Sequence, residues 1–300
     1  MNGRNKKMLY AVLLAAMTVC FITACGKSSP KQVSKMEEKD MDSITQYQWT
    51  SKEISCNIGS QSIYGIAYIP EKEGKFPLVI FAHELCNTHT AGIDYAKSLA
   101  AVGIAAYTFD FRGGSAGSRS DGKTTEMSVM TEADDLDAVM RCAKEWDFVD
   151  SERVVLLGGS QGGAAAAVAA ERNEDQVAGL ILLYPAFVIY DEVHTQFHSL
   201  EDVPDNFDFL GWIQVGRNYV SDIWDYDNYG NMENYEKPVL LIHGDRDFTV
   251  DISYSERAAE SYPDADLQVI KGTGHGFYGE SFEEAMQYIF GYLKEIGILE

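Results

Sequence analysis

A serine in a glycine-rich turn is the strongest chemical signal in this chain. Residues 158–163 read Gly-Gly-Ser-Gln-Gly-Gly, which makes Ser160 the centre of a G-x-S-x-G motif. The apolar residues 154–157 precede the motif and the alanine-rich residues 164–170 follow it, a pattern that predicts a strand, a tight turn and a helix. Small neighbours permit the strained backbone of a nucleophile elbow. The motif therefore predicts a nucleophilic serine, and an ordinary serine in a glycine-rich turn is the alternative.

A serine hydroxyl needs a general base, and the base needs a carboxylate that orients it. After a nucleophile on a strand–turn–helix motif, these partners follow in the order acid, then histidine. His275 lies in a glycine-rich loop beyond the last predicted strand, residues 266–270, and is the candidate base. The acid is Asp247 or Asp245, which both follow the predicted strand 238–243. We favour Asp247 because it lies further into its loop.

Two backbone N–H groups are expected to bind the oxyanion that forms when the serine attacks a carbonyl. One is the N–H of Gln161, directly after the nucleophile, and the other comes from the loop that follows His83, where we choose Leu85. We expect substrate contacts from His83 itself and from two tryptophans further along the chain, Trp212 and Trp224.

The elements that must position these residues alternate between strands and helices. Residues 51–69 predict an antiparallel hairpin, and the alternation that follows predicts an α/β fold with a mostly parallel sheet and helices on both faces. The predicted strands after the hairpin are 76–82, 104–109, 154–157, 177–184, 238–243 and 266–270, and the predicted helices include 94–102, 130–146 and 282–296.

The alternation breaks between residues 186 and 235, a stretch rich in aromatic side chains. A structureless loop of that length is uncommon in a compact domain, so we predict an inserted cap over the mouth of the site. An ordinary excursion with buried aromatic residues is the alternative.

Within this stretch, Asp225 and Asp227 open a partial EF-hand pattern, but Tyr229 breaks the fifth position and Pro238 blocks the helix that should follow. We predict no metal and no cofactor.

The N-terminus has the pattern of an exported lipoprotein. Basic residues precede the apolar residues 8–24, and small residues precede Cys25. We predict a lipoprotein signal over 1–24, lipidation of Cys25, a flexible tether over 25–50 and one domain over 51–300, hence an extracytoplasmic protein anchored to the bacterial cell membrane by lipid. A plain signal peptide and a single membrane anchor are the alternatives.

Composition excludes several classes of function. The formal net charge of -22 argues against nucleic acid and against docking on anionic lipid, so lipid alone would attach the chain to a membrane. Of the five cysteines, Cys56, Cys86 and Cys142 lie in the predicted domain, far apart and odd in number. This spacing fits neither a disulfide framework nor a zinc site. At most one bridge is possible, and we expect isolated thiols.

Taken together, these motifs resemble the bacterial α/β-hydrolase esterases that include the cinnamoyl and feruloyl esterases. The resemblance covers most of the chain after residue 51 and rests on five segments: the loop after His83, Asp110-Phe111-Arg112-Gly113, residues 158–163, His243-Gly244-Asp245-Arg246-Asp247, and Gly274-His275-Gly276-Phe277. It implies an α/β-hydrolase fold with a cap, and it places the acid at Asp247. Glu84 departs from the pattern, because the family usually has glycine there.

The sequence thus predicts a serine esterase that cleaves small-molecule carboxylic esters through an acyl-enzyme, with hydroxycinnamoyl or short acyl groups as candidates. A serine peptidase or thioesterase could use the same residues. A non-catalytic binding lipoprotein is the alternative from another class, and its support is Glu84.

Overall fold

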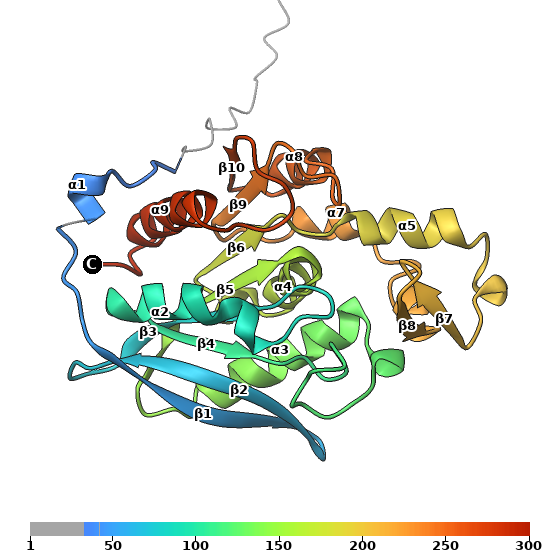
Figure 1. Cartoon of the computed structure of the whole chain (residues 1–300), viewed down its shortest axis with the longest axis horizontal. Helices are drawn as coiled ribbons and strands as arrows, with labels where there is room; N and C mark the ends of the chain where they lie inside the picture. Colours follow the sequence, from blue (N-terminus) through green and yellow to red (C-terminus); the bar gives the residue numbers. More distant parts are fainter. Residues whose placement is uncertain (1–32, 42) are drawn as a thin grey trace, which may run out of the picture.

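An eight-stranded sheet forms the centre of the molecule in the structure, a computed structural model that describes residues 33–41 and 43–300 (Figure 1). The strand order is β1-β2-β4-β3-β5-β6-β9-β10. Its strands are β1 Trp49–Ile58, β2 Gln61–Pro70, β3 Phe76–Ala82, β4 Ala105–Phe109, β5 Val149–Gly159, β6 Gly179–Leu183, β9 Val239–Gly244 and β10 Ala265–Ile270. Neighbours are parallel from β4 to β10, whereas β1 and β2 are antiparallel, as predicted.

Helices cover both faces of this sheet, which confirms the predicted fold class. The α-helices are α1 Glu38–Met41, α2 Ile93–Ala101, α3 Val129–Ala143, α4 Ser160–Arg172, α5 Val188–Gln196, α6 Asn218–Ser221, α7 Asn228–Met232, α8 Ser253–Ser261 and α9 Glu280–Glu295. Short 3-10 helices are η1 His89–Gly92, η2 Thr124–Glu126, η3 Glu174–Gln176 and η4 Leu200–Asp202.

The side-chain alternation of the strands divides the core into two layers. On β3, Leu78 and Ile80 belong to the core layer that includes α3, α4 and α8, while Val79 and Phe81 belong to the layer that includes α2 and α9 on the other face. Because β3 is buried on both faces, its sequence is a continuous apolar run rather than an alternating one. Because the strands from β4 to β10 run parallel, their carboxyl ends meet at one edge of the sheet, and the loops that follow them lie together there.

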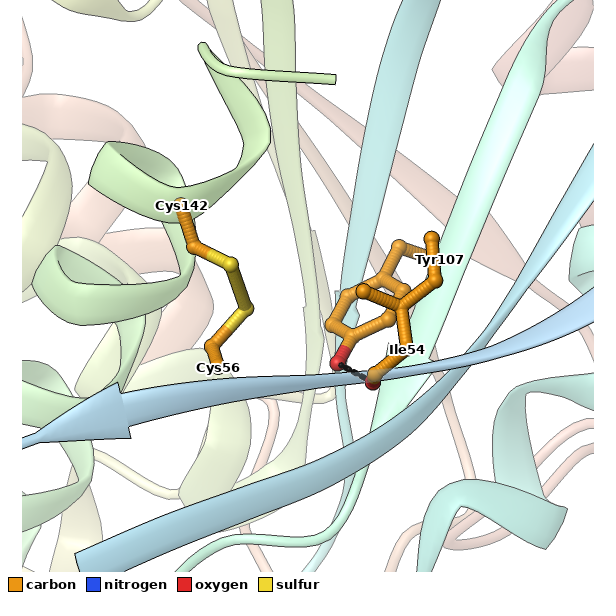
Figure 2. Close-up of a disulfide and its surroundings, with 4 residues drawn as sticks. All are labelled: Ile54, Cys56, Tyr107 and Cys142. Carbon is orange, nitrogen blue, oxygen red and sulfur yellow. Dashed lines mark hydrogen bonds between the residues drawn. A yellow bond between two sulfur atoms is a disulfide. The ribbon is translucent and has the colours of Figure 1, made fainter.

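A disulfide joins Cys56 of β1 to Cys142 of α3, with the two Cα atoms 5.8 Å apart (Figure 2). Close by, the Tyr107 hydroxyl on β4 donates a hydrogen bond to the carbonyl of Ile54 at 2.8 Å. Both links attach the outermost hairpin to the rest of the fold. The expectation of isolated thiols was wrong for this pair, because the chain folds back over a sequence separation of 86 to bring the two cysteines together. Cys86 stays a free, half-buried thiol.

The segment before the hairpin lies against the domain from residue 33 onward. The Val33 N–H donates to Asp266 Oδ2 at 3.0 Å, and the Met36 N–H donates to the Gln287 carbonyl on α9 at 3.3 Å. Both apolar side chains are buried. Within the stretch that we expected to be a flexible tether, Val33 and Met36 are therefore held against the domain by apolar burial and hydrogen bonds. The predicted signal and Cys25 lie outside the described residues, and within these residues no helix is long and apolar enough to cross a membrane.

Residues 186–235, the predicted cap, leave the sheet after β6 and return to it at β9 (Figure 1). This cap segment contains α5, η4, α6, α7 and a two-stranded hairpin of β7 Asn206–Phe209 and β8 Ile213–Gly216. The Ser128 hydroxyl at the start of α3 donates to Asp222 at 2.6 Å, and the Thr124 hydroxyl in η2 donates to the Gln214 carbonyl at 2.6 Å. These bonds attach the segment beside the carboxyl edge of the sheet.

Candidate active site

Ser160 lies where β5 ends and α4 begins, as the motif predicts. Its φ of 50° is in the left-handed region, which costs strain for any residue other than glycine. A Cβ on Gly158 would collide with backbone atoms of Gly162, and one on Gly162 would collide with the carbonyls of Ala82 and His83. The glycines are therefore needed because the turn packs against the end of β3.

Three side chains from separate loops form a continuous hydrogen-bonded chain. His275 Nε2 lies 2.8 Å from Ser160 Oγ, and His275 Nδ1 lies 2.7 Å from Asp247 Oδ2. Ser160 is 8% exposed, so its hydroxyl is screened from bulk water but still at the surface of the site. The carboxyl ends of β5, β9 and β10 supply the three residues. The geometry brings together the residues that the sequence analysis selected.

Asp247 is surrounded by N–H donors. Its Oδ1 accepts the backbone N–H groups of Thr249 at 2.8 Å and Val250 at 2.9 Å, and its Oδ2 faces His275. Burial by itself raises the pKa of Asp247, but hydrogen bonds from Val250, His275 and Thr249 outweigh burial and hold the pKa below its ordinary value. The carboxylate is therefore charged and able to orient the imidazole of His275.

Asp245, the alternative acid, braces two loops instead. Its Oδ1 accepts the Gly272 N–H at 2.6 Å, and this bond connects the loop after β9 to the loop after β10. A Cβ on Gly244 would collide with the carbonyl of Thr273 across the same junction. The choice of Asp247 over Asp245 thus agrees with the positions of both side chains.

Gln161 occupies the first turn of α4, where helix geometry leaves backbone N–H groups without helical partners. The loop that carries Leu85 packs closely on this turn, because the carbonyls of Ala82 and His83 lie against Gly162. Leu85 is half-buried. Both predicted oxyanion donors therefore belong to segments that meet beside Ser160.

Glu84, the residue that departs from the family pattern, has donors at both carboxylate oxygens. Tyr184 Oη donates to Oε1 at 3.0 Å, and Asn87 Nδ2 donates to Oε2 at 3.1 Å. The Tyr184 ring also packs edge-on against the imidazole of His275, with ring centroids 4.8 Å apart. These contacts hold the carboxylate beside Gly159 and Tyr184, and its charge is partly compensated there.

A second polar network lies behind the nucleophile. The Gln161 side chain donates from Nε2 to Glu132 Oε1 at 3.0 Å, and its Oε1 accepts the Tyr219 hydroxyl at 2.7 Å. Glu132 is 1% exposed, and burial raises its pKa to about 8 although the Gln161 bond lowers it in part. Tyr219 belongs to the cap segment, so this network joins that segment to the residue after Ser160.

The three expected substrate contacts have different positions. His83 is buried, with Nε2 accepting the Phe111 N–H at 3.1 Å and Nδ1 2.8 Å from the Glu84 carbonyl, so it holds its loop and cannot face a substrate. The Trp224 ring packs against the His194 ring within the cap segment, with the two ring planes tilted by 50°. Trp212 is 63% exposed and lines a cavity of about 420 Å³ whose wall also contains Cys86. Of the three, Trp212 is the one that lines a cavity, and its contact with a substrate stays a prediction.

Sequence reasoning missed four residues of the site: His243, Ser255, Glu132 and Tyr219. Two of them carry a signal that could have been used. His243 is a polar residue that ends an apolar strand four positions before the acid, and Glu132 lies on the apolar face of a predicted helix. For Ser255 and Tyr219 we find no such signal.

Asp227 caps α7 through the Gly230 N–H at 2.9 Å, and the described residues hold no acidic, histidine or cysteine cluster suited to a metal ion.

The fold and the arrangement of Ser160, His275 and Asp247 define an α/β hydrolase. The sequence model of the prolyl oligopeptidase family matches residues 94–296, and the chain belongs to that family.

Curated relatives match this chain over only part of their own length. An uncharacterized 31.7 kDa protein of the traX-finO intergenic region of Escherichia coli is 30% identical over 128 residues, 42% of this chain and 43% of that protein. Dipeptidyl peptidase 8 of Mus musculus is 25% identical over 257 residues, 78% of this chain and 27% of that protein. The chain thus spans less than half the length of these relatives.

Solved structures match over nearly their whole length. Est1E from Butyrivibrio proteoclasticus with ferulic acid bound has a TM-score of 0.73 and 25% identity, and covers 81% of this chain and 99% of its own. A monoacylglycerol lipase from Paleococcus ferrophilus has a TM-score of 0.61 at 18% identity, covering 78% and 99%, which shows the common fold.

Proposed function

We propose that this protein is a serine hydrolase that cleaves carboxylic esters through an acyl-enzyme. The observation that carries the proposal is the unbroken chain from Ser160 Oγ through His275 to Asp247, at 2.8 and 2.7 Å. Such distances are within the range needed for proton transfer between nucleophile and base.

The reaction follows from these positions. Ser160 Oγ attacks the ester carbonyl while His275 Nε2 takes the hydroxyl proton, and Asp247 stabilises the imidazolium that forms. The N–H groups of Gln161 and Leu85 bind the oxyanion. His275 then returns the proton to the departing alcohol, and a water molecule, activated by the same imidazole, releases the acid from Ser160. Residues of this chain perform each step.

For the substrate we propose hydroxycinnamoyl or short acyl esters. Est1E, whose structure contains ferulic acid, supports an aromatic acyl group by its similarity. The cavity beside Cys86 offers an indole from Trp212 and neutral polar groups from Asn87, Thr88 and Gln214, a lining suited to a small uncharged molecule. The net charge of -22 also favours a neutral substrate over an anionic one.

Peptide hydrolysis is the second candidate, and the family match together with dipeptidyl peptidase 8 favours it. The same nucleophile, base and oxyanion donors would serve an amide. A panel of methyl ferulate, p-nitrophenyl acetate, acyl thioesters and peptide p-nitroanilides separates the candidates by kcat/KM. The ester proposal expects the highest value on an ester, and a higher value on a peptide substrate would replace it with the second candidate.

The nucleophile is tested with Ser160→Ala, using the exposed Ser221→Ala as the matched control. We expect Ser160→Ala to lose at least about 10³-fold in turnover of p-nitrophenyl acetate and all labelling by a fluorophosphonate, because the hydroxyl is the attacking group. Ser221→Ala should keep both. Equal turnover by Ser160→Ala and wild type would refute the assigned nucleophile.

We further propose that the protein is exported and anchored to the bacterial cell membrane by lipid on Cys25. The lipobox-like sequence before Cys25 supports this, and so does the disulfide between Cys56 and Cys142, since disulfides persist mainly in oxidising compartments. Metabolic labelling with an alkyne fatty acid should mark wild type and spare Cys25→Ser, and Cys25→Ser should leave the membrane fraction. Retention of Cys25→Ser in membranes would contradict the anchor.

A further inference from the structure

His243 is a second histidine at the catalytic acid. It lies near the end of β9, and its side chain is 0% exposed. Its Nε2 lies 3.2 Å from Asp247 Oδ2 and 3.1 Å from the Val250 carbonyl, and its Nδ1 lies 2.7 Å from Ser255 Oγ on α8. The proposed mechanism gives this residue no part in proton transfer, yet it contacts the same carboxylate oxygen as His275.

The partners determine which ring nitrogen of His243 carries the proton. The Asp247 carboxylate and the Val250 carbonyl can only accept hydrogen bonds, so Nε2 must be the donor to both. Burial lowers the pKa of His243 and keeps the ring neutral, which leaves Nδ1 as an acceptor. Ser255 Oγ is the group that can donate to it. The ring is therefore held in one tautomer and one orientation by α8.

The Nε2–H of His243 bonds to both ends of the turn formed by residues 247–250. Asp247 Oδ1 accepts the Val250 N–H at 2.9 Å, while His243 Nε2 bonds the other oxygen of Asp247 and the Val250 carbonyl. His243 thus closes the turn 247–250 and limits rotation of the carboxylate. Since Oδ2 also receives the His275 N–H, the orientation of the catalytic imidazole depends on how firmly this carboxylate is held.

We propose that His243, held by Ser255, is a positioning residue that presents Asp247 to His275 for the hydrolytic reaction. The inference rests on the proposed function, because it needs Asp247 and His275 to be the catalytic pair. It gives His243 and Ser255 a role in the reaction, and neither contacts the substrate. Outer partners that orient metal ligands commonly contribute 10- to 100-fold to activity, and we expect an effect of similar size here.

The test compares His243→Leu, which keeps bulk but loses the donor, with His243→Gln, whose amide nitrogen replaces Nε2. On p-nitrophenyl acetate we expect kcat to fall by about 10- to 100-fold in His243→Leu, with KM within about twofold. The acidic limb of the kcat/KM profile should move to lower pH by about 0.5 to 1 unit, because a displaced carboxylate stabilises protonated imidazole less. His243→Gln should restore most of the rate and the limb.

Ser255→Ala, with the half-buried Ser261→Ala on the same helix as its control, gives a second measurement if His243→Leu fails to fold by circular dichroism. We expect Ser255→Ala to lose a few-fold in kcat and to shift the acidic limb in the same direction, and Ser261→Ala to match wild type. Rates are normalised to sites titrated with a fluorophosphonate, so that unfolded protein does not count.

Three results would overturn the positioning role: full kcat in His243→Leu, a loss of kcat with an unshifted limb, or identical behaviour of Ser255→Ala and Ser261→Ala. Each result leaves the proposed function standing as long as Ser160→Ala is inactive. Full activity of Ser160→Ala would instead refute the proposed function itself, so the two failures are distinguishable.

Discussion

Two buried carboxylates lie on either side of the nucleophile, and their surroundings differ. Asp247, on the loop after β9, receives N–H groups from Thr249, Val250, His275 and His243. Glu132, on α3, receives one from Gln161, and its Oε2 has no hydrogen-bond partner among the described residues. Both are removed from water, yet the pKa of Asp247 is lowered and the pKa of Glu132 is raised to about 8.

The difference shows that burial alone does not decide the charge of a carboxyl group. Burial raises the pKa of both groups. At Asp247 the N–H donors and the nearby His275 outweigh burial, whereas at Glu132 the Gln161 bond offsets burial only in part and the charge of Asp135 raises the pKa further. Asp247 keeps its charge because four N–H groups replace the lost water, whereas Glu132 is mostly protonated at neutral pH. The surroundings of Asp247 therefore stabilise a charged carboxylate, whereas the surroundings of Glu132 favour a neutral carboxyl group that is hydrogen-bonded to Gln161.

The largest expected effect comes from exchanging each carboxylate for its amide. Asp247→Asn should lower kcat by about 10⁴-fold, because an amide cannot stabilise the imidazolium or select the correct tautomer. Glu132→Gln should change kcat by less than about threefold, since the native group is already neutral. Steady-state kinetics on p-nitrophenyl acetate at pH 7 measures both. Comparable losses of kcat in Asp247→Asn and Glu132→Gln would contradict the assignment of a charged Asp247 and a neutral Glu132.

Between pH 5 and 9, the contribution of Glu132 to the free energy of unfolding should change with pH, whereas the contribution of Asp247 should not. The raised pKa of Glu132 means that the folded state binds more protons than the unfolded state, so this residue destabilises increasingly as pH rises from about 4.5 to 8. The lowered pKa of Asp247 gives stability that is fully present above its ordinary pKa of 3.8 and is lost only in acid. Glu132→Gln should therefore stabilise more at pH 9 than at pH 5, by about 4 kcal/mol.

Urea unfolding of Glu132→Gln and wild type at the two pH values provides the measurement. Glu126→Gln, an exchange of the same kind at an exposed residue of η2, is the control and should show no such difference. Equal stabilisation by Glu132→Gln at pH 5 and pH 9 would show that Glu132 is charged in the folded protein.

The smallest effect concerns the bond between the cap segment and the nucleophile turn. Tyr219→Phe leaves Gln161 Oε1 buried without its donor, so the free energy of unfolding should fall by about 1 to 3 kcal/mol. Tyr254→Phe removes an exposed hydroxyl bond to Asp191 and should change it by less than about 0.5 kcal/mol. Denaturant titration compares the two. A smaller loss for Tyr219→Phe than for Tyr254→Phe would show that the second network does not stabilise the fold.

Much of the site could be predicted because its signals are local. A glycine-rich turn between an apolar strand and an alanine-rich helix identifies Ser160, and the order of the strand ends selects Asp247 and His275. The segments around Glu84 and Tyr219 resisted prediction, because whether a buried polar group finds partners depends on chain segments far away. Tyr184 lies 100 residues from Glu84, and Gln161 lies 58 residues from Tyr219.

By itself, the sequence determined the strand–helix alternation, the parallel sheet and the identity of Ser160, His275 and Asp247, since hydrophobic periodicity and turn chemistry act over a few residues. The tertiary structure decided the Cys56–Cys142 bridge, the docking of residues 33–36 on α9, and which of two buried carboxylates is charged. These outcomes depend on distances between segments that only the folded chain brings together, and on whether the donors that meet a buried group are enough to replace water.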